Sequence, residues 1–412
     1  MTRVVIVGCG FPQLSLVRTA KRRGLFVIGA DANARAVAVR HCDEFVEVST
    51  HDVDGLCDVV RRTHADGVTT TGSEVSLKAT ASVAARMRLS FYADEATVRR
   101  CQDKDVMRAA YSSAGLAVPA FARCESPNEA YEFARKHGFP LVVKPSRGWG
   151  QRGVARVESQ AELAPAFAQA RAHSAGAGLP VVVVETWFAG REYSVNGWIE
   201  DGRLVSYCVT ERITVPGNQP LGVMIAEVFP SGLGAADEER VIEEARRGAA
   251  ALGHRRGPCY SQVGLGPSGC ILFETAARLG GGFDADVTRL ASGVDLYERL
   301  LGVAFGDTAA ENKGPTSAPH SAAIAKFLVA RPGIVRGVYG LDAAQSLDGV
   351  DDAQVFVPVG GRVMPLTDSA KRAAYVLTHG GTRGEAIERA DAALARIRIE
   401  TQQEELRAET SA

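Results

Sequence analysis

Three glycines and three basic residues lie close together in residues 141–157, which read LVVKPSRGWGQRGVARV. The basic residues are Lys144, Arg147 and Arg152, the glycines are Gly148, Gly150 and Gly153, and Ser146 lies among them. Glycine lets backbone N–H groups approach a ligand closely, and basic side chains attract an anion. We therefore expect two strands joined by a loop that folds over a phosphate group. An ordinary surface hairpin is the alternative, and the missing Gly-Lys-Ser/Thr excludes a Walker loop.

An amide and a carboxylate lie on two expected strands within residues 258–283. Gln262 is on the first strand, Glu274 is on the second, and the turn 266–269 separates them. Antiparallel pairing about this turn brings both side chains to one face, within reach of one cation. Magnesium prefers oxygen ligands and shares them with substrate phosphates, so the pair predicts a Mg²⁺ site.

A further cation and a run of glycines follow this pair. Arg278 precedes Gly280, Gly281 and Gly282. A guanidinium beside free backbone N–H groups stabilises the charge on a transferring phosphoryl group or an acyl phosphate. We expect Arg278 and Gly281 to act in catalysis, and a hairpin followed by a glycine-rich linker is the alternative.

Aromatic residues between two carboxylates suggest a place for a flat ring. Trp187 and Phe188 lie between Glu185 and Glu192, in a connector that also contains Thr186. The aromatic side chains can enclose the ring, the connector backbone can bond an adenine edge, and a carboxylate can accept from ribose hydroxyls. This stretch predicts a nucleoside site only in combination with the phosphate loop.

Polar residues near the N-terminus offer a place for a small substrate. The turn that contains Gly10 is similar to a dinucleotide-binding turn, and Asp31 follows the next expected strand, but Gln13 stands where a third glycine is needed. We therefore expect Gly10 to contact a small substrate rather than a nicotinamide cofactor. Ser73 and Glu74 follow another strand, where they either bind a polar ligand or cap the next helix.

A lysine opens one of the expected helices. Lys104 lies in the first turn of a helix over residues 104–114. The N-terminus of a helix carries partial positive charge, so a lysine there is unfavourable unless it faces an anion. Lys104 is therefore a candidate phosphate ligand, with a solvated surface lysine as the alternative.

The elements that position these residues begin with an alternation of strands and helices. We expect strands at 4–7, 26–28, 45–48 and 67–70 and helices at 14–23, 53–63 and 75–87. Such alternation predicts a parallel sheet whose ligands bind at the carboxyl ends of its strands. The central region should have helices at 94–101, 104–114, 131–137, 161–173 and 236–252, and a Pro/Gly-rich loop at 215–222.

The expected fold class is α/β and α+β, with three domains. We expect a Rossmann-like domain at 1–93, a central domain at 94–306 with a smaller lid part at about 115–190, a linker at 307–319 and an α+β domain at 320–412. The last domain should have strands at 322–330, 335–339, 355–359 and 374–378 and a helix at 383–396. It contains no cluster of catalytic side chains, so we expect it to act as a structural cap.

The composition of the 412 residues indicates a globular protein. Hydrophobic residues make up 46%, charged residues 23%, and the net charge is −1, which gives no electrostatic reason for binding nucleic acid or an anionic membrane. No apolar run approaches the roughly 20 residues of a membrane span, and we expect no signal peptide before the first strand. Eight cysteines occur singly, as expected for thiols in the reducing cytoplasm rather than for disulfides or a zinc site.

Taken in order, the motifs resemble the ATP-grasp superfamily of carboxylate–amine and carboxylate–thiol ligases. These motifs are a Rossmann-like start, Asp-Lys, Val-Val-Lys-Pro with a glycine loop, ExxxxGxE, and a glutamine followed by ExxxR and glycines. The resemblance covers essentially the whole chain. It implies a two-part ATP-grasp core and the small C-terminal domain that is found in the purine-biosynthetic and carboxylase branches.

The resemblance implies ATP and Mg²⁺ as cofactors and gives each matched residue a role. Lys104, Lys144, Ser146, Gly148, Gly150 and Gly153 would bind the phosphates, and Glu185, Thr186, Trp187, Phe188 and Glu192 the nucleoside. Gln262 and Glu274 would hold magnesium, Arg278 and Gly281 would act in catalysis, and Gly10, Ser73, Glu74 and Arg278 would contact the substrate. Two positions depart from the family pattern, because Gln262 stands where Glu is frequent and Ala276 where Asn is frequent.

The function implied is formation of an amide or peptide-like bond from a small carboxylate and a small amine, through an acyl phosphate. An amino-acid ligase is the favoured branch, and a carboxylase or purine-pathway enzyme that activates bicarbonate or formate is the alternative. A regulatory protein that binds nucleotide without turnover is an alternative of another class. Homodimers are common for this architecture, so a homodimer is expected.

Overall fold

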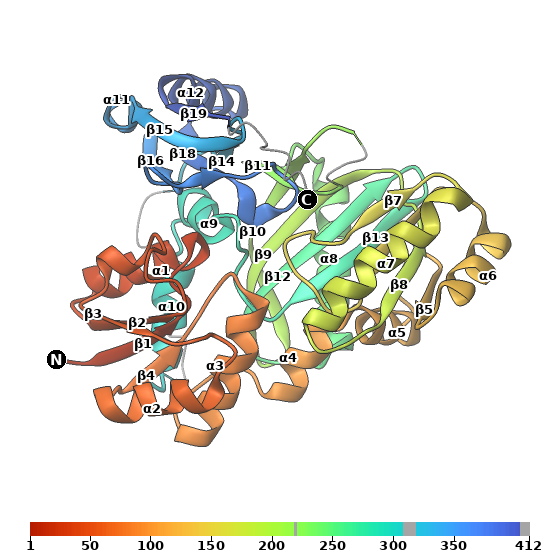
Figure 1. Ribbon diagram of the computed structural model, residues 1–412, viewed down its shortest axis with the longest axis horizontal. Coiled ribbons are helices and arrows are strands. Elements are labelled where there is room, and N and C mark those ends of the chain that lie inside the picture. The colour runs from red at the N-terminus through yellow and green to blue at the C-terminus, as the bar shows by residue number, and fades with distance from the viewer. Residues whose placement is uncertain (218–220, 308–318, 404–412) are drawn as a thin grey trace, which may run out of the picture.

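The computed structural model describes residues 1–217, 221–307 and 319–403. It combines a parallel sheet with antiparallel sheets and covering helices, so the expected α/β and α+β fold class is confirmed (Figure 1). The expected Pro/Gly loop at 215–222 lies partly outside the described residues, and the expected linker at 307–319 lies almost wholly outside them. The domain boundaries therefore stay predictions.

The N-terminal part is a parallel sheet of four strands in the order β3-β2-β1-β4. Its elements are β1 (Arg3–Val7), α1 (Phe11–Arg22), β2 (Phe26–Asp31), η1 (Val39–His41), β3 (Glu44–Glu47), α2 (Val53–Thr63), β4 (Gly67–Thr69) and α3 (Glu74–Met87). The central strand β1 is apolar on both faces, and helices cover both, as in other parallel sheets. The carboxyl ends of β1, β2 and β4 point toward the centre of the molecule.

The lid part is a second sheet of four strands, in the order β5-β8-β6-β7. Two helices, α4 (Glu95–Gln102) and α5 (Lys104–Ser113), lead into it, and it consists of β5 (Phe121–Cys124), α6 (Pro127–His137), β6 (Leu141–Pro145), β7 (Ala155–Val157), α7 (Gln160–Gly176) and β8 (Val182–Thr186). β6 and β7 pair antiparallel, with Leu141 opposite Val157, so the expected hairpin is confirmed. The residues between these strands, 146–153, are called the glycine loop below.

The largest sheet has eight strands in the order β13-β12-β9-β10-β11-β14-β18-β16, and all neighbours pair antiparallel. The first five are β9 (Arg191–Glu200), β10 (Arg203–Thr214), β11 (Met224–Phe229), β12 (Gly257–Gly266) and β13 (Gly269–Ala276). The last three are β14 (Ala322–Leu328), β16 (Val350–Val355) and β18 (Ala374–Gly380). The helices α8 (Ala235–Ala251), α9 (Asp284–Ser292) and α10 (Leu296–Ala304) pack against this sheet and the N-terminal part.

Most strands of the C-terminal part belong to the central sheet, because β14, β16 and β18 extend it through the pairing of β11 with β14. A small sheet of β15 (Gly333–Tyr339), β17 (Arg362–Val363) and β19 (Arg398–Gln402) lies beside it, with α11 (Leu341–Gln345), η2 (Ser369–Lys371) and α12 (Arg383–Arg396). The expected strand at 355–359 is wrong, since β16 ends at Val355. The sequence analysis also missed β5, α9, α10 and β19.

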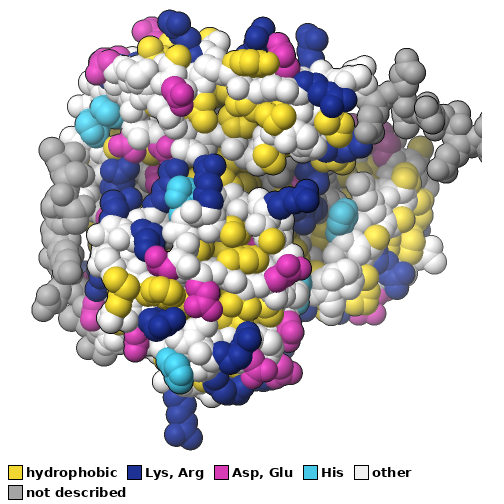
Figure 2. All heavy atoms as spheres, turned by 60° about the vertical axis from the view of Figure 1, so that its left-hand side comes forward, with side chains coloured by type: hydrophobic (Ala, Val, Ile, Leu, Met, Phe, Trp, Pro, Cys, Tyr) yellow, Lys and Arg dark blue, Asp and Glu magenta, His cyan; other side chains and the backbone are white. Residues whose placement is uncertain are grey.

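None of the helices in the described ranges combines the length and the apolar character that a bilayer span requires. All eight cysteines are free thiols. Figure 2 shows Lys and Arg side chains gathered along the seam between the C-terminal part, above, and the N-terminal sheet, below. The ion pair of Arg18 with Asp352 crosses this seam, and Arg289 of α9 pairs with the neighbouring Asp351.

Candidate active site

Two adjoining cavities lie where the parts of the molecule meet. The larger, called the chamber, has a volume of about 510 Å³, and the smaller, called the slot, about 110 Å³. Both are lined by Lys104, Gln151, Val154, Gln262 and Glu274. The two cavities are therefore parts of one cleft, with Glu274 and Lys104 at their junction.

The slot lies between the lid sheet and the central sheet and has aromatic walls. Trp187 and Phe188 line it, and the Phe188 ring packs edge-on against Phe273, with centroids 5.8 Å apart. The backbone N–H groups of Thr186 and Trp187 donate to the carbonyl oxygens of Ala120 and Pro140, which directly precede β5 and β6. Among the described residues the N–H of Phe188 has no acceptor, so it is available to a ligand that enters the slot.

A buried ion cluster forms one wall of the slot. The carboxylate of Glu185 accepts from Lys144 and from the guanidinium of Arg108, at 2.9 Å from Nε. Burial lowers the pKa of Lys144 to about 8, and the positive charge of Arg108 acts in the same direction. Burial alone would raise the pKa of Glu185, but Arg108 and Lys144 outweigh it and lower that pKa to about 2. Both groups are therefore charged at neutral pH.

Arg108 is the residue of this cluster that the sequence analysis missed. It lies one helical turn after Lys104 on α5, is fully buried, and also donates to the carbonyl oxygens of Leu272 and Phe273 on β13. Arg108 thus ties the lid strand that carries Glu185 to the strand that carries Glu274. The spacing of a lysine and an arginine by four residues on one helix face was the signal that was available.

The glycine loop closes the cleft over Lys104. Lys104 Nζ donates to the carbonyl oxygen of Gly148 at 2.9 Å, and Gly148 and Gly150 line the chamber. The expectation that all three basic residues of this region attract an anion is wrong. Arg147 makes a two-pronged ion pair with Asp103, at 2.7 Å for both nitrogens, so it anchors the loop instead of facing a ligand.

Two further contacts join the glycine loop to the C-terminal part. The backbone N–H of Ser369 donates to the carbonyl oxygen of Gly150 at 2.9 Å, and Arg152 lies 3.4 Å from the Asp368 carboxylate. Ser369, Ala370 and Arg372 line the chamber. The C-terminal part therefore forms a wall of the cavity, which its interpretation as a structural cap did not include.

The expected metal ligands face each other across the central hairpin. Gln262 and Glu274 are paired residues of β12 and β13, next to an irregularity in the register, and both line both cavities. Gln262 Nε2 donates to the hydroxyl of Tyr260 at 3.2 Å, which leaves its carbonyl oxygen for a cation. Burial would raise the pKa of Glu274, but Lys104, Arg278 and Lys144 outweigh it and lower that pKa.

One carboxylate and one amide oxygen suit a magnesium ion that also binds phosphate oxygens. Within the described ranges, no three His, Cys, Asp or Glu side chains are grouped as ligands for a metal. The donor set thus fits a magnesium ion that enters with a nucleotide and does not fit a metal held by protein alone. Ala276 follows on β13 and supplies no ligand.

Arg278 extends from the end of β13 into the chamber. Its Nε donates to Glu74 at 2.6 Å, and its Nη2 lies 4.0 Å from Glu274. Gly281 follows in a loop against the N-terminal part, where a Cβ on Gly281 would lie 2.7 Å from the carbonyl oxygen of Gly72. Glycine is required here because the two backbones approach this closely.

The expected substrate-binding residues of the N-terminal part follow the carboxyl ends of β1 and β4. Gly10, Ser73 and Glu74 line the chamber, and the Ser73 side chain also caps α3 by accepting from the N–H of Ser76. The amide of Gln13 accepts from Gly10 N–H at 3.1 Å and donates to the Thr71 carbonyl oxygen at 2.5 Å. Gln13 therefore fills the turn in which a dinucleotide-binding site has a glycine.

Most of the proposed site residues line the cleft, and two do not. Lys104, Lys144, Gly148, Gly150, Glu185, Thr186, Trp187, Phe188, Glu192, Gln262, Glu274, Arg278, Gly281, Gly10, Ser73 and Glu74 line the slot or the chamber. Ser146 is buried and bonded to Asp105, and Gly153 packs near His173. The structure thus gives these two residues a supporting position, away from the cavity walls.

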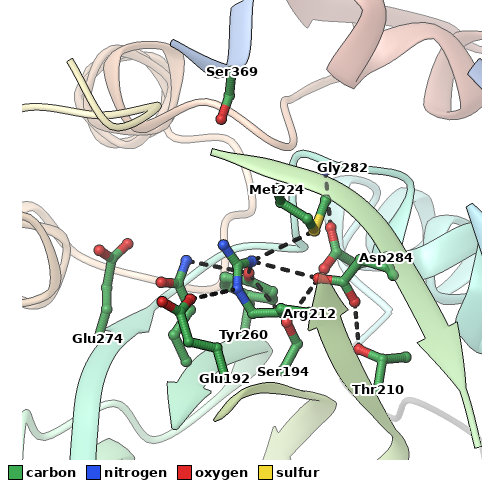
Figure 3. Close-up of polar contacts among 12 residues, drawn as sticks. Glu192, Ser194, Thr210, Arg212, Met224, Tyr260, Glu274, Gly282, Asp284 and Ser369 are labelled. Carbon is green, nitrogen blue, oxygen red and sulfur yellow. Dashed lines mark hydrogen bonds and ion pairs between the residues drawn. The ribbon is translucent and has the colours of Figure 1, made fainter. Parts of the chain in front are cut away.

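A charged network on the central sheet was also missed by the sequence analysis (Figure 3). Arg212 on β10 donates to the Tyr260 hydroxyl at 2.5 Å and pairs with Glu192 and Glu227. Burial and the neighbouring Asp284 raise the pKa of Glu227 well above its usual value, while Arg212 acts in the opposite direction. Arg212, Tyr260 and Asp284 all line the chamber.

Two family models match the sequence. Residues 103–311 match the ATP-binding domain of the carbamoyl-phosphate synthase large chain, and residues 326–402 match the second C-terminal domain of L-amino acid ligases. The first match covers about half of the chain and contains the lid sheet, β9 to β13 and the slot. The second contains Ser369 and Arg372.

Individual proteins agree with these models. The uncharacterized protein y4rH of Sinorhizobium fredii is 27% identical over 71% of this chain and 60% of its own length. D-alanine–D-alanine ligase of Streptomyces coelicolor is 35% identical over 22% of this chain and 25% of its own length. The chain thus spans between a quarter and three fifths of these relatives. The crystal structure of L-amino acid ligase from Bacillus licheniformis has the same fold, with a TM-score of 0.80, 20% identity and coverage of 98% and 99%.

Proposed function

The chain belongs to the ATP-grasp superfamily of ligases, and from this membership we propose that it uses ATP to join a small carboxylate to a small amine through an acyl phosphate. The single observation that carries the proposal is the junction of slot and chamber at Glu274, Gln262 and Lys104. A nucleotide that fills the slot presents its terminal phosphate to a substrate in the chamber. The C-terminal match to L-amino acid ligases favours an amino acid as a substrate.

In the first step the substrate carboxylate attacks the terminal phosphorus of ATP, which gives an acyl phosphate and ADP. Lys144 and Lys104 hold the phosphates, and the guanidinium of Arg278 offsets charge on the group in transfer. Mg²⁺ at Gln262 and Glu274 would supply further charge compensation on the phosphate oxygens. The aromatic walls of the slot hold the adenine ring, and the N–H of Phe188 can bond its edge.

In the second step the amine attacks the acyl carbon, phosphate leaves with the C–O electron pair, and the amine loses a proton. The oxyanion of the tetrahedral intermediate faces Arg278 and the backbone around Gly281. The closed glycine loop excludes water, which would otherwise hydrolyse the acyl phosphate.

The test is an ATPase screen that scores phosphate release across pools of amino acids, bicarbonate and formate. We expect release only when an amino-acid pool is present, with a new amide product in the mass spectrum. Release with bicarbonate or formate instead would identify the carboxylase or purine-pathway alternative. ATP binding without release in every pool would identify a regulatory nucleotide-binding protein. A homodimer stays a prediction, which light scattering of the purified protein can test.

A further inference from the structure

One arginine in the wall of the chamber forms no ion pair with any described residue. Arg372 follows η2, is 5% exposed, and lines the chamber. Its Nε and Nη2 donate to the carbonyl oxygen of Met224 at 3.1 and 2.8 Å, and its guanidinium lies over the Phe327 ring, 3.9 Å from the centroid. Within the described residues no carboxylate lies within 4.0 Å of this guanidinium. Asp284 and Glu227 favour its charged form only from beyond ion-pair distance, so a bound anion would offset more of the cost of burying this charge.

The free end of Arg372 points into the chamber. Nη1 has no hydrogen-bond acceptor among the described residues, and it lies 3.8 Å from the position that a Cβ on Gly282 would occupy. Nη2 is also 3.5 Å from the hydroxyl of Ser369. Figure 3 shows this Ser369 hydroxyl on the side of the chamber opposite Arg212.

Arg212 supplies a second free donor from the facing wall. Its Nε and Nη1 contact Glu192, Glu227 and Tyr260, whereas Nη2 has no partner among the described residues. Figure 3 shows one nitrogen of Arg212 turned toward the Ser369 side, free of contacts. Burial and the positive charge of Arg212 lower the pKa of Arg372 to about 10, and an anion bound between the two guanidinium groups would offset their repulsion.

The free nitrogens of Arg372 and Arg212 and the hydroxyl of Ser369 lie on the far side of Tyr260 from the reaction centre, and this position suggests which group they bind. The ring of Tyr260 separates Arg212 from Arg278, since the Tyr260 hydroxyl accepts from Arg212 and the Arg278 guanidinium lies 5.5 Å from the ring centroid. The Arg278 side is the place of the acyl group, so the anion beyond Tyr260 is a second group of the substrate. Two nitrogens and one hydroxyl match the two oxygens of a carboxylate, and nearby Asp284 disfavours a dianion such as phosphate.

We propose that Arg372, with Arg212 and Ser369, binds a carboxylate of the amine substrate, a group distinct from the carboxylate that is activated. This inference rests on the proposed ligase function and deepens it. The amine substrate is then itself an amino acid, and the product keeps a free carboxylate. The C-terminal part determines specificity, while the chemistry takes place on β12 and β13.

The test compares matched amine substrates in the phosphate-release assay at saturating ATP. Each amino acid that supports release is compared with its carboxamide and its decarboxylated amine. For the unmodified protein we expect a KM for the acid at least about tenfold below that of the carboxamide, as for a charge-assisted hydrogen bond. In Arg372→Met this difference should disappear, with the KM for ATP unchanged, and Arg372→Lys should restore part of it.

Arg299→Met is the matched control. Arg299 is also a buried arginine over an aromatic ring, 5.0 Å from the Trp198 centroid, but it lines neither cavity. Its loss should leave the preference for the acid intact. Equal KM values for acid and carboxamide in the unmodified protein overturn the proposal, as does an Arg372→Met variant in which both KM values rise equally. Preference for an aminoalkyl phosphate over the amino acid also overturns it.

If no amine supports phosphate release, the proposed function is refuted, but the carboxylate subsite can still be tested by a second measurement. Phenylglyoxal modifies unpaired guanidinium groups, and peptide mapping reports its reaction at Arg372. Acetate should slow this modification and acetamide should not. Equal effects of acetate and acetamide, or stronger protection by inorganic phosphate than by acetate, contradict a carboxylate subsite.

Discussion

The buried Lys144 makes nucleotide affinity depend on pH in a defined window. Its pKa is about 8 instead of 10.5, because burial and Arg108 disfavour the charged form. We expect ATP to bind the protonated form, in which Nζ can donate to phosphate. About one tenth of the protein carries this proton one pH unit above the pKa, so the dissociation constant should rise roughly tenfold between about pH 7 and about pH 9.

Isothermal titration calorimetry at a series of pH values measures this change directly. Titrations in two buffers of different ionisation enthalpy should also show that ATP binding takes up a proton above about pH 8. Lys144→Arg is the matched variant, because a guanidinium stays charged throughout this range. Its affinity should be independent of pH in the same window.

The stability of the unliganded protein should change in the opposite direction. Between pH 8 and 10.5 the unfolded chain holds a proton on Lys144 that the folded chain has released, so this residue adds stability as the pH rises. Relative to Lys144→Arg, the unmodified protein should therefore gain up to about 3 kcal/mol across this window. A pH-independent affinity of the unmodified protein, or the same loss of affinity in Lys144→Arg, would refute the assignment of Lys144 to the phosphates.

Three further substitutions test other parts of the site. Glu274→Ala should lower turnover by at least about a hundredfold while circular dichroism stays unchanged, because one charge-stabilising group is lost; near-normal turnover would contradict the metal assignment. Arg108→Met should lower the free energy of unfolding, measured by urea titration, by about 3–5 kcal/mol, because Glu185 loses a buried partner. As a control, Arg61→Ala removes an exposed ion pair with Asp58 and should cost less than about 1 kcal/mol. Gly281→Ala would place a methyl group 2.7 Å from the Gly72 carbonyl oxygen, so turnover should fall and the midpoint of thermal unfolding should drop by a few degrees; unchanged values for both would contradict the close approach of the two loops.

The local features of the site were predictable because each depends on a short stretch of chain. The hairpin that carries Lys144 and the opposition of Gln262 and Glu274 follow from strand patterns separated by glycine turns, and the structure has both. The amphipathic helix α12 was predicted with its observed bounds. In each case the sequence signal lies within one or two neighbouring elements.

The ion pairs between residues that lie far apart in the sequence could not be predicted. Arg147 looks like a free cation in its own loop, yet Asp103 compensates it from the start of α5. Arg108 meets Glu185 only after the lid sheet has folded onto α5. Composition and spacing contain no information on these partners, because the tertiary fold alone determines which acid a buried arginine meets.

The continuity of the central sheet was unpredictable for the same reason. The strand pattern at 322–330 identifies β14 but does not indicate that β14 pairs with β11, since any amphipathic strand edge can accept another. This pairing brings residues after 320 to the cleft. It explains how Arg372 and Ser369 reach the chamber from a segment that has no catalytic motif of its own.

The two contacts between the glycine loop and the C-terminal part make closure of the cleft easily reversible. The lid sheet shares no strand pairing with the central sheet among the described residues, so the loop can move without disrupting a ladder of hydrogen bonds. One backbone hydrogen bond from Ser369 and the ion pair of Arg152, whose side chain is 37% exposed, are each worth about 1 kcal/mol or less. Contacts of this strength let the closed loop exclude water during the reaction and let products leave. Because Ser369 belongs both to this closure and to the proposed carboxylate subsite, we expect a substrate that binds this subsite to favour the closed loop.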